Sequence, residues 1–319
     1  MIVVAGESLV DLLPAKGGRE GVLTMEAHAG GSPYNCAIAL SKLGVDTGFL
    51  CPFSTDGFGE LLLNPLREAG VAPLIKARSS APTTLAVVTL DPQGKAQYQF
   101  YRNGTADSDF TLKGLIAALP ARPRVLQLGG FCAVTERDAD IWLDLAAEAM
   151  KRGALITMDP NLRPALAGDL PAYRARLNRF FNITHFVKLS DEDLEVLDPD
   201  KDMAAHARNL LGRRNCGLVV VTRGAEGSVA YNGHYKVEVP VYAPAEFGDT
   251  VGAGDSLMAG VLAALSERGA LAHSALDALS ADALHEILQF GAVVAGLNCA
   301  RTGCHPPSRT EVDAVFTAG

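Results

Sequence analysis

Short apolar runs alternate with amphipathic helical segments along most of this chain. The runs at 125–128, 155–158 and 218–222 are nearly continuous strings of apolar residues, which is typical of parallel strands covered on both faces. Residues 135–152 carry apolar side chains at helical spacing behind Thr135, a good N-cap. The alternation predicts an α/β fold with a doubly wound, mainly parallel sheet flanked by helices.

Composition narrows the class of protein. The chain has 319 residues without a low-complexity linker or internal repeat, so we expect 1–319 to form a single domain. Its formal net charge of −8 argues against nucleic-acid binding. We see no membrane-spanning stretch, no signal-peptide pattern and no Cys-x-x-Cys pair, and we therefore expect a cytoplasmic protein with reduced thiols.

Two regions interrupt the alternation. Residues 82–103 read as a β-hairpin with a turn at 91–94, and residues 8–28 read as short strands around Gly17 and Gly18. We predict that these regions form one small β-sheet projecting from the main domain.

The segment 248–256 is the most informative for chemistry. Gly252 and Gly254 let backbone N–H groups turn inward, and the first turn of the following helix attracts negative charge. Asp255 at the start of that helix would be an ionised base beside an anion site. A helix cap after an ordinary glycine turn explains the same residues about equally well.

A second polar segment precedes a strongly apolar helix. Gly30 and Gly31 allow close approach by a ligand, and Asn35 offers a donor and an acceptor to hydroxyl groups. Taken alone, a packing turn with a satisfied buried amide is the safer interpretation.

Further polar residues follow predicted strands, where ligands of doubly wound sheets collect. Asp159, Asn161 and Arg163 come after the strand at 155–158, and this combination suits polyhydroxyl and phosphate recognition. Asp11 lies just past the first strand. Thr222 and the N–H of Gly224 follow the strand at 218–222 and could bind a nucleotide phosphate. An ordinary loop exit and a glycine hairpin remain alternatives for these segments.

Together these segments are similar to the ribokinase-like, phosphofructokinase-B type carbohydrate kinases, and the likeness runs nearly end to end. The diglycine segment with Asn35 resembles the first signature of that family, and residues 249–255 resemble the more specific second one. The two signatures lie about 215 residues apart in the expected order.

The resemblance implies ATP-dependent transfer of phosphate to a sugar hydroxyl, with Asp255 as catalytic base and an anion hole at Gly252, Ala253 and Gly254. Arg163 would add positive charge near the transferred phosphate. The projecting β-sheet at about 8–28 and 82–103 would be a lid, and the edge strands of such a lid would allow two subunits to pair as a homodimer. The predicted sugar-binding residues are Asp11, Gly30, Gly31, Asn35, Phe100, Arg102 and Asp159. The predicted ATP-site residues are Lys188, Ser190, Thr222, Gly224, Gly227 and Asn298.

The resemblance also implies two metal ions. Asp249, Val251 and Gly303 match positions that hold an activating monovalent cation, expected to be K⁺. Family members commonly have Asn-x-x-Glu acting on Mg²⁺, whereas this chain has Ser190 and Asp193. We assign the magnesium-linked carboxylate, acting through water, to Asp193, and Glu192 is the alternative. The dispersed histidines predict no zinc site.

Segments 98–102, 159–163, 188–190 and 298–307 look most like bacterial fructokinases, which implies fructose as the acceptor and O6 as the attacking oxygen. A 2-keto-3-deoxygluconate kinase, in which Arg102 or Arg163 would meet the acid, is the alternative, as are other sugar or nucleoside kinases. A non-catalytic sugar-binding homologue is the alternative of another class. A nicotinamide-dependent oxidoreductase is disfavoured because Gly-x-Gly-x-x-Gly does not follow the first strand.

Overall fold

The main sheet dominates the computed structural model, which describes residues 1–15, 21–90 and 96–317. Among these residues its nine strands run in the order β13-β12-β11-β10-β9-β8-β1-β4-β5. All neighbours pair in parallel except β11–β12 and β12–β13, which are antiparallel. The strands are β1 Ile2–Ala5, β4 Thr47–Leu50, β5 Ala72–Pro73, β8 Val125–Gly129, β9 Leu155–Asp159, β10 Phe186–Ser190, β11 Leu218–Thr222, β12 Ser228–Tyr231 and β13 Lys236–Val239.

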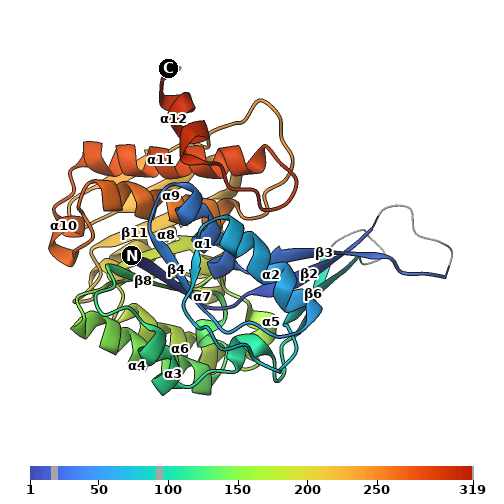
Figure 1. The fold of residues 1–319 in the computed structure, drawn as a ribbon. Helices are drawn as coiled ribbons and strands as arrows, with labels where there is room; N and C mark the ends of the chain where they lie inside the picture. Colours follow the sequence, from blue (N-terminus) through green and yellow to red (C-terminus); the bar gives the residue numbers. More distant parts are fainter. Residues whose placement is uncertain (16–20, 91–95, 318–319) are drawn as a thin grey trace.

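Helices cover both faces of this sheet (Figure 1). One layer contains α1 Ser32–Lys42, α2 Gly57–Glu68, α9 Ala253–Glu267, α11 Ala281–Cys299 and α12 Arg309–Thr317. The other contains α3 Leu112–Ala118, α4 Glu136–Lys151, α6 Leu170–Phe181 and α8 Met203–Leu211. The short helices α5 Pro164–Ala167, α7 Asp191–Leu197 and α10 His273–Asp277 connect the larger elements.

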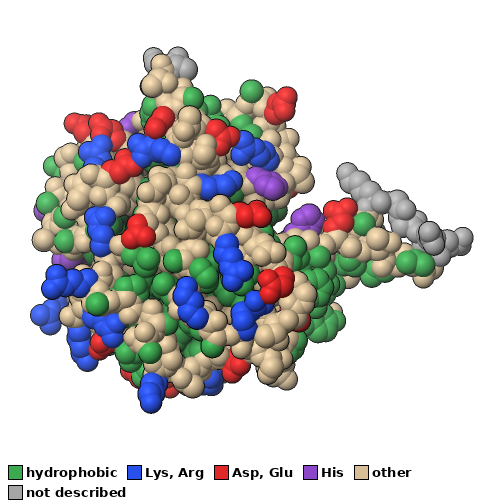
Figure 2. Space-filling model, viewed as in Figure 1, with side chains coloured by type: hydrophobic (Ala, Val, Ile, Leu, Met, Phe, Trp, Pro, Cys, Tyr) green, Lys and Arg blue, Asp and Glu red, His purple; other side chains and the backbone are tan. Residues whose placement is uncertain are grey.

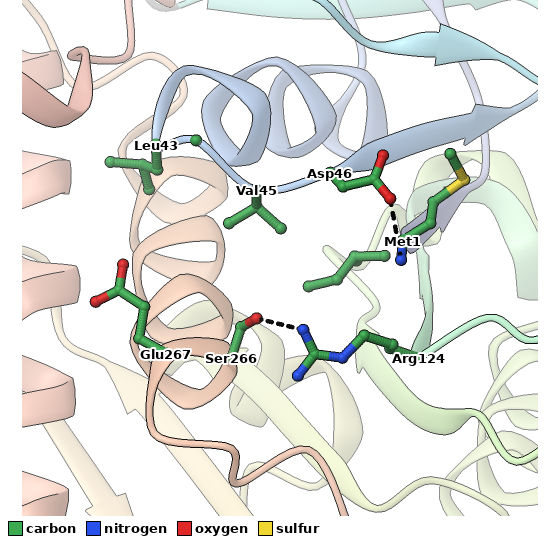
Figure 3. Close-up of a pocket in the computed structure, with 9 residues that line it drawn as sticks. Met1, Leu43, Val45, Asp46, Arg124, Ser266 and Glu267 are labelled. Atoms are coloured by element: carbon green, nitrogen blue, oxygen red, sulfur yellow. Dashed lines mark hydrogen bonds and ion pairs between the residues drawn. The ribbon is translucent and has the colours of Figure 1, made fainter.

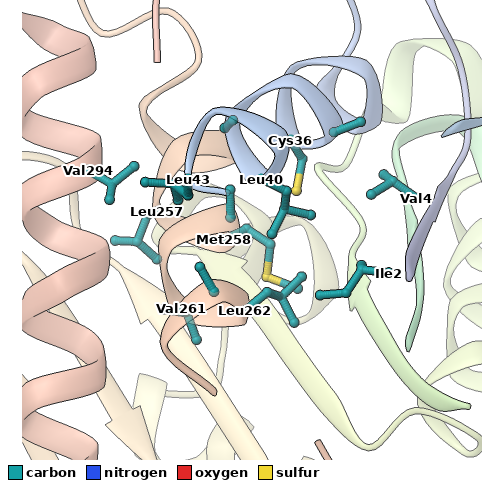
Figure 4. Close-up of a cluster of buried hydrophobic side chains, with 14 of the residues drawn as sticks. Ile2, Val4, Cys36, Leu40, Leu43, Leu257, Met258, Val261, Leu262 and Val294 are labelled. Atoms are coloured by element: carbon teal, nitrogen blue, oxygen red, sulfur yellow. The ribbon is translucent and has the colours of Figure 1, made fainter. Parts of the chain in front are cut away.

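The two helical layers explain why the strands read as continuous apolar runs. In β1, Ile2 and Val4 belong to the core cluster under one layer, and Val3 and Ala5 belong to the cluster under the other. Figure 4 shows Ile2 and Val4 facing side chains from α1 and α9, among them Leu40 and Met258. The predicted fold class is therefore confirmed.

The first core positions the helices that later form the site. α1 packs on α9, and α9 packs on α11 so closely that a Cβ added to Gly260 would lie 2.7 Å from the Cα of Gly291. This arrangement brings the amino-terminal turns of α1 and α9 together, although they are more than 200 residues apart in sequence.

A second sheet of four described strands projects from the main body (Figure 1). Its order is β3-β2-β6-β7, with β2 Leu9–Pro14, β3 Met25–Gly30, β6 Leu85–Leu90 and β7 Ala96–Tyr101. Figure 2 shows this sheet standing clear of the globular part, with apolar side chains on part of its surface. We call it the lid sheet; the turn predicted at 91–94 and Gly17–Gly18 lie outside the described residues.

Among the described residues, no helix combines the length and hydropathy needed to cross a membrane.

Candidate active site

Asp255 lies in the first turn of α9 and is held at both carboxylate oxygens. Ser32 Oγ donates to Oδ1 at 2.6 Å, and Asn35 Nδ2 donates to Oδ2 at 2.9 Å. The side chain is nearly buried, with 8% exposure. Burial raises the pKa of Asp255, while the hydrogen bonds from Ser32 and Asn35 oppose that rise. The result is an oriented carboxylate of increased basicity.

Sequence reasoning missed Ser32 as a partner of Asp255. Gly31 is the N-cap of α1, and Ser32 is its first helical residue. The hydroxyl is therefore free of capping and reaches across to α9. The only sequence signal for this role is a serine next to two glycines, and that signal does not indicate Asp255 as the partner.

The turn before α9 depends on glycine at two positions. Gly252 has φ of 75°, and a Cβ there would lie 2.3 Å from Cys304 Sγ. A Cβ on Gly254 would lie 2.9 Å from Lys188 Nζ. Of the predicted anion-hole amides, Ala253 N–H donates to Thr250 O at 3.1 Å. Gly254 N–H lies in the first turn, where amides have no partner within the helix.

A buried ion pair lies next to this turn. Lys188 Nζ donates to Asp159 Oδ2 at 2.8 Å, and both side chains are almost fully buried. Burial opposes charging Lys188, but Asp159, Asp193 and Asp255 more than compensate, and the pKa of Lys188 is raised. Burial raises the pKa of Asp159 to about 6, against the effect of Lys188. Asp159 Oδ1 is buried without a hydrogen-bond partner, so it remains available to a ligand.

The residues predicted to contact sugar converge on the root of the lid. Asp11 on β2 pairs in register with His28 on β3, and a Cβ on Gly30 would lie 2.3 Å from Asp11 Oδ2. Burial raises the pKa of Asp11 to about 6, and His28 and Arg163 lower it while Asp255 raises it. These influences place Asp11, Arg163 and Asp255 within electrostatic range of one another.

Gly31 and Phe100 complete this group. Gly31 has φ of 112°, and a Cβ there would lie 2.9 Å from Glu7 O. Phe100 on β7 meets the ring of Phe131 edge-on, with centroids 5.7 Å apart. Arg163 Nη1 donates to the backbone oxygens of Leu162 at 2.9 Å and Asn161 at 3.3 Å, so its charge is available to an anion.

Arg102 has a different environment from the one expected. Its Nε donates to Asp107 Oδ2 at 3.0 Å, and its Nη2 donates to Asp138 Oδ2 at 2.9 Å. The guanidinium that was predicted to bind substrate is thus paired with two buried carboxylates. Neither carboxylate was identified from the sequence.

The predicted nucleotide residues come from several elements: Lys188 and Ser190 from β10, Thr222 from the end of β11, Gly224 and Gly227 from the turn between β11 and β12, and Asn298 from α11. Thr222 Oγ1 is 3.4 Å from Leu189 O, and Gly224 and Gly227 have φ of 51° and 85°. A Cβ on Gly227 would lie 2.2 Å from Val239 O, whereas Gly224 faces open space. Asn298 is fully buried and braces the later loops, donating to Val251 O at 2.7 Å and accepting from His305 N at 2.9 Å.

The carboxylate assigned to magnesium is part of a helix cap. Asp193 accepts from Leu162 N and Ser190 N, each at 2.8 Å, and Ser190 Oγ accepts from Asp193 N. Glu192 is exposed in the same turn. Asp193 is therefore fixed to the loop that follows β9, through the amide of Leu162.

The three positions matched to a monovalent cation are brought together. Asp249 Oδ1 accepts from Val251 N at 2.9 Å, and Asp249 Oδ2 accepts from Gly303 N at 2.8 Å. These hydrogen bonds tie the loop before α9 to the loop after α11. In the described part of the chain, no three His, Cys, Asp or Glu side chains gather as a metal cluster.

A small pocket of about 180 Å³ lies at the opposite, amino-terminal ends of β1 and β4 (Figure 3). Its polar groups already pair with each other: the Met1 amino group lies 3.2 Å from Asp46, and Arg124 donates to Ser266 Oγ at 3.0 Å. It contains none of the predicted site residues.

The fold and this site, with a buried carboxylate at a glycine-rich helix start, are those of an α/β phosphotransferase. Residues 1–311 match the family model described as pfkB family carbohydrate kinase. A fructokinase of Rhizobium leguminosarum bv. trifolii is 36% identical over 288 residues, covering 89% of this chain and 85% of that protein.

Two solved structures are also similar. Fructokinase with bound ATP from Xylella fastidiosa has a TM-score of 0.86 and 27% identity, covering 99% of this chain and 98% of that one. A fructokinase variant from Vibrio cholerae O395 with fructose, ADP and a potassium ion has a TM-score of 0.81 at 21% identity, covering 98% and 97%, and shares the fold. The chain belongs to the pfkB family of carbohydrate kinases, and it is an ATP-dependent kinase of that family.

Proposed function

We propose that this kinase transfers the γ-phosphate of ATP to the O6 hydroxyl of fructose. The observation that carries the chemistry is the buried Asp255 carboxylate, oriented by Ser32 and Asn35 beside the turn at 252–254. The names of the relatives at 36% and 27% identity support fructose as the acceptor.

In the proposed reaction Asp255 takes the proton from the acceptor hydroxyl as its oxygen bonds to the γ-phosphorus. The bond between that phosphorus and the β,γ-bridging oxygen breaks, and ADP leaves with the electron pair. Arg163 and the Gly254 amide would stabilise the equatorial oxygens. Asp11, Gly30, Gly31 and Asn35 would orient the sugar, and Phe100 would help the lid sheet exclude water.

We assign ATP binding to the region of Lys188, Ser190, Thr222, Gly224 and Gly227. Asn298 would act there as a brace, because its amide is already used by Val251 and His305. The magnesium ion that accompanies ATP would neutralise phosphate charge. The unpartnered Oδ1 of Asp159, together with Asp193, suits its water shell. The loops joined through Asp249 suit K⁺.

We also propose a homodimer formed through the lid sheets. Tyr98 and Tyr101 on the edge strand β7 are 59% and 52% exposed, and Leu23 before β3 is 72% exposed. Exposed apolar side chains along a sheet edge favour pairing with a second chain.

A coupled assay of ADP release tests the substrate. Fructose, 2-keto-3-deoxygluconate, ribose and a nucleoside would each be supplied with Mg-ATP, in potassium or in sodium buffer of equal ionic strength. We expect the highest kcat/KM for fructose and faster turnover in potassium. A higher kcat/KM for the sugar acid would replace fructose as the substrate. Sugar binding by calorimetry without any ADP release would instead support a non-catalytic homologue.

A further inference from the structure

A buried charge cluster lies at the root of the lid sheet. Arg102 directly follows β7, and its guanidinium bridges Asp107 and Asp138 at 3.0 and 2.9 Å. The three side chains have exposures of 11%, 1% and 2%. We call Arg102, Asp107 and Asp138 the hinge cluster. Asp138 Oδ1 also accepts from Arg137 Nη1 at 3.1 Å, on the exposed side of the cluster. Removing Arg102 would therefore leave the buried Asp107 without this ion pair, while Asp138 would keep Arg137.

The hinge cluster joins the lid hairpin to the main body at both of its strands. Thr84, just before β6, donates its hydroxyl to Asp107 Oδ1, and Thr105, after β7, donates to the same oxygen at 2.6 Å. Asp138 lies in the first turn of α4, where Thr135 accepts its backbone N–H. The entry and exit of the hairpin therefore both contact Asp107, in the 3₁₀ helix Ala106–Ser108, and Arg102 links Asp107 to α4.

Phe131 connects the hinge cluster to β2, a third strand of the lid sheet. The guanidinium of Arg102 lies 5.1 Å from the ring centroid of Phe131, and Phe100 meets the same ring edge-on. Phe131 N donates to Glu7 Oε2 at 2.8 Å, and Glu7 lies two residues before β2. Thus β2, β6 and β7 all meet this cluster where they leave the main body.

We propose that Arg102 is a positioning residue whose two ion pairs set the angle of the lid sheet relative to α4. Through that angle they place the face bearing Phe100 over the site at Asp11 and Asp255. Because its charge is offset by two carboxylates, Arg102 does not contact the substrate, and its effect on the reaction passes through the lid. This inference rests on the proposed function, phosphorylation of fructose, for its catalytic readout only.

The catalytic test compares variants from two different elements. Arg102→Gln and Asp138→Asn should each raise the sugar KM by about tenfold and raise the ratio of ADP to sugar phosphate above one, because a misplaced lid admits water. The double variant should be no worse than the single ones, since both remove the same connection. Arg179→Gln is the matched control: Arg179 also contacts two carboxylates of α4, Glu136 and Asp140, but on the exposed surface, and it should leave both quantities unchanged.

A measurement without catalysis separates this proposal from the proposed function. Hydrogen exchange at the lid strands, residues 85–89 and 97–101, should accelerate in Arg102→Gln and Asp138→Asn but not in Arg179→Gln. Arg102→Lys keeps the positive charge but cannot donate to both carboxylates in the fixed geometry of a guanidinium. It should therefore fold and show a smaller acceleration of exchange in the lid strands.

Two outcomes would overturn the proposal. The first is a raised sugar KM in Arg102→Gln with normal kinetics in Asp138→Asn, which would make Arg102 a substrate contact. The second is unchanged lid exchange in both variants. If lid exchange is accelerated in the variants but the protein phosphorylates no sugar, the positioning role of Arg102 is supported and only the proposed function is rejected.

Discussion

Two hydrogen bonds orient the Asp255 carboxylate, and an asparagine side chain at this position would occupy nearly the same volume. Asp255→Asn should lower kcat by roughly 10²- to 10⁴-fold, because the amide cannot take the hydroxyl proton. The sugar KM should change little, since Ser32 and Asn35 remain in place. Steady-state kinetics with purified, folded variant would measure both quantities.

A suitable control for that substitution is Asp202→Asn. Asp202 caps α8 by accepting from Ala205 N at 2.7 Å and belongs to none of the predicted sites. It should retain full turnover. Near-normal turnover in Asp255→Asn would remove Asp255 from the role of base.

Glu7 carries a pH prediction that concerns stability. Burial raises its pKa from 4.5 to about 7, more than the hydrogen bond from Phe131 N lowers it. Between these values the folded chain binds more protons at this site than the unfolded chain. The stability that Glu7 contributes is therefore complete below pH 4.5. It is lost as the pH rises through 7, and the free energy of unfolding then falls by on the order of 3 kcal/mol.

Glu7→Gln should remove this dependence, because the amide remains neutral throughout. Urea unfolding of Glu7→Gln and of the unchanged chain, each at pH 5 and pH 8, would test this. The free energy of unfolding of the variant minus that of the unchanged chain should be larger at pH 8 than at pH 5. An equal difference at both pH values would show that Glu7 titrates normally in the folded state.

At the scale of an element, the start of α9 predicts a position-specific cost. Gly252→Ala would strain a residue with φ of 75° and push its Cβ against Cys304. Gly269 has a similar φ of 67° but no atom near its Cβ position. Both alanine variants should lose about 1–2 kcal/mol of stability from strain, but only Gly252→Ala should also lose at least tenfold in kcat. Equal activity in the two variants would argue against a functional role for the turn.

The same elements show what the sequence could and could not predict. Apolar runs and caps predicted the strands and α4, because those signals are local. The segments around Asn35 and Asp255 were found through glycine patterns and family likeness, and the fold then brings them into contact. The partners of Arg102 could not be predicted, because Asp107 and Asp138 meet it only when a lid strand, a short 3₁₀ turn and α4 are assembled. Neither spacing nor charge pattern in the chain indicates that meeting.

At the scale of the molecule, the site lies where the sheet order reverses direction. From β1 the chain proceeds outward through β4 and β5, and then returns to β8 on the other side. The carboxyl ends of β1 and β8–β11 consequently face a common edge, which is where doubly wound sheets bind ligands. The lid sheet leaves the body at the same edge, next to Asp11 and Gly30. In the proposed function this edge would both orient the sugar and exclude water.

The lid sheet also predicts the assembly of the whole molecule. If its exposed edge pairs with a second chain, light scattering coupled to size exclusion should give a mass twice that of one chain. Tyr101→Glu and Leu23→Glu should shift that mass toward the monomer, because a charge on an apolar sheet edge opposes pairing. Tyr235→Glu is the control, since Tyr235 is 46% exposed but follows β12 in the main sheet. A monomeric unchanged chain would contradict the dimer, and loss of dimer in all three variants would place the interface elsewhere.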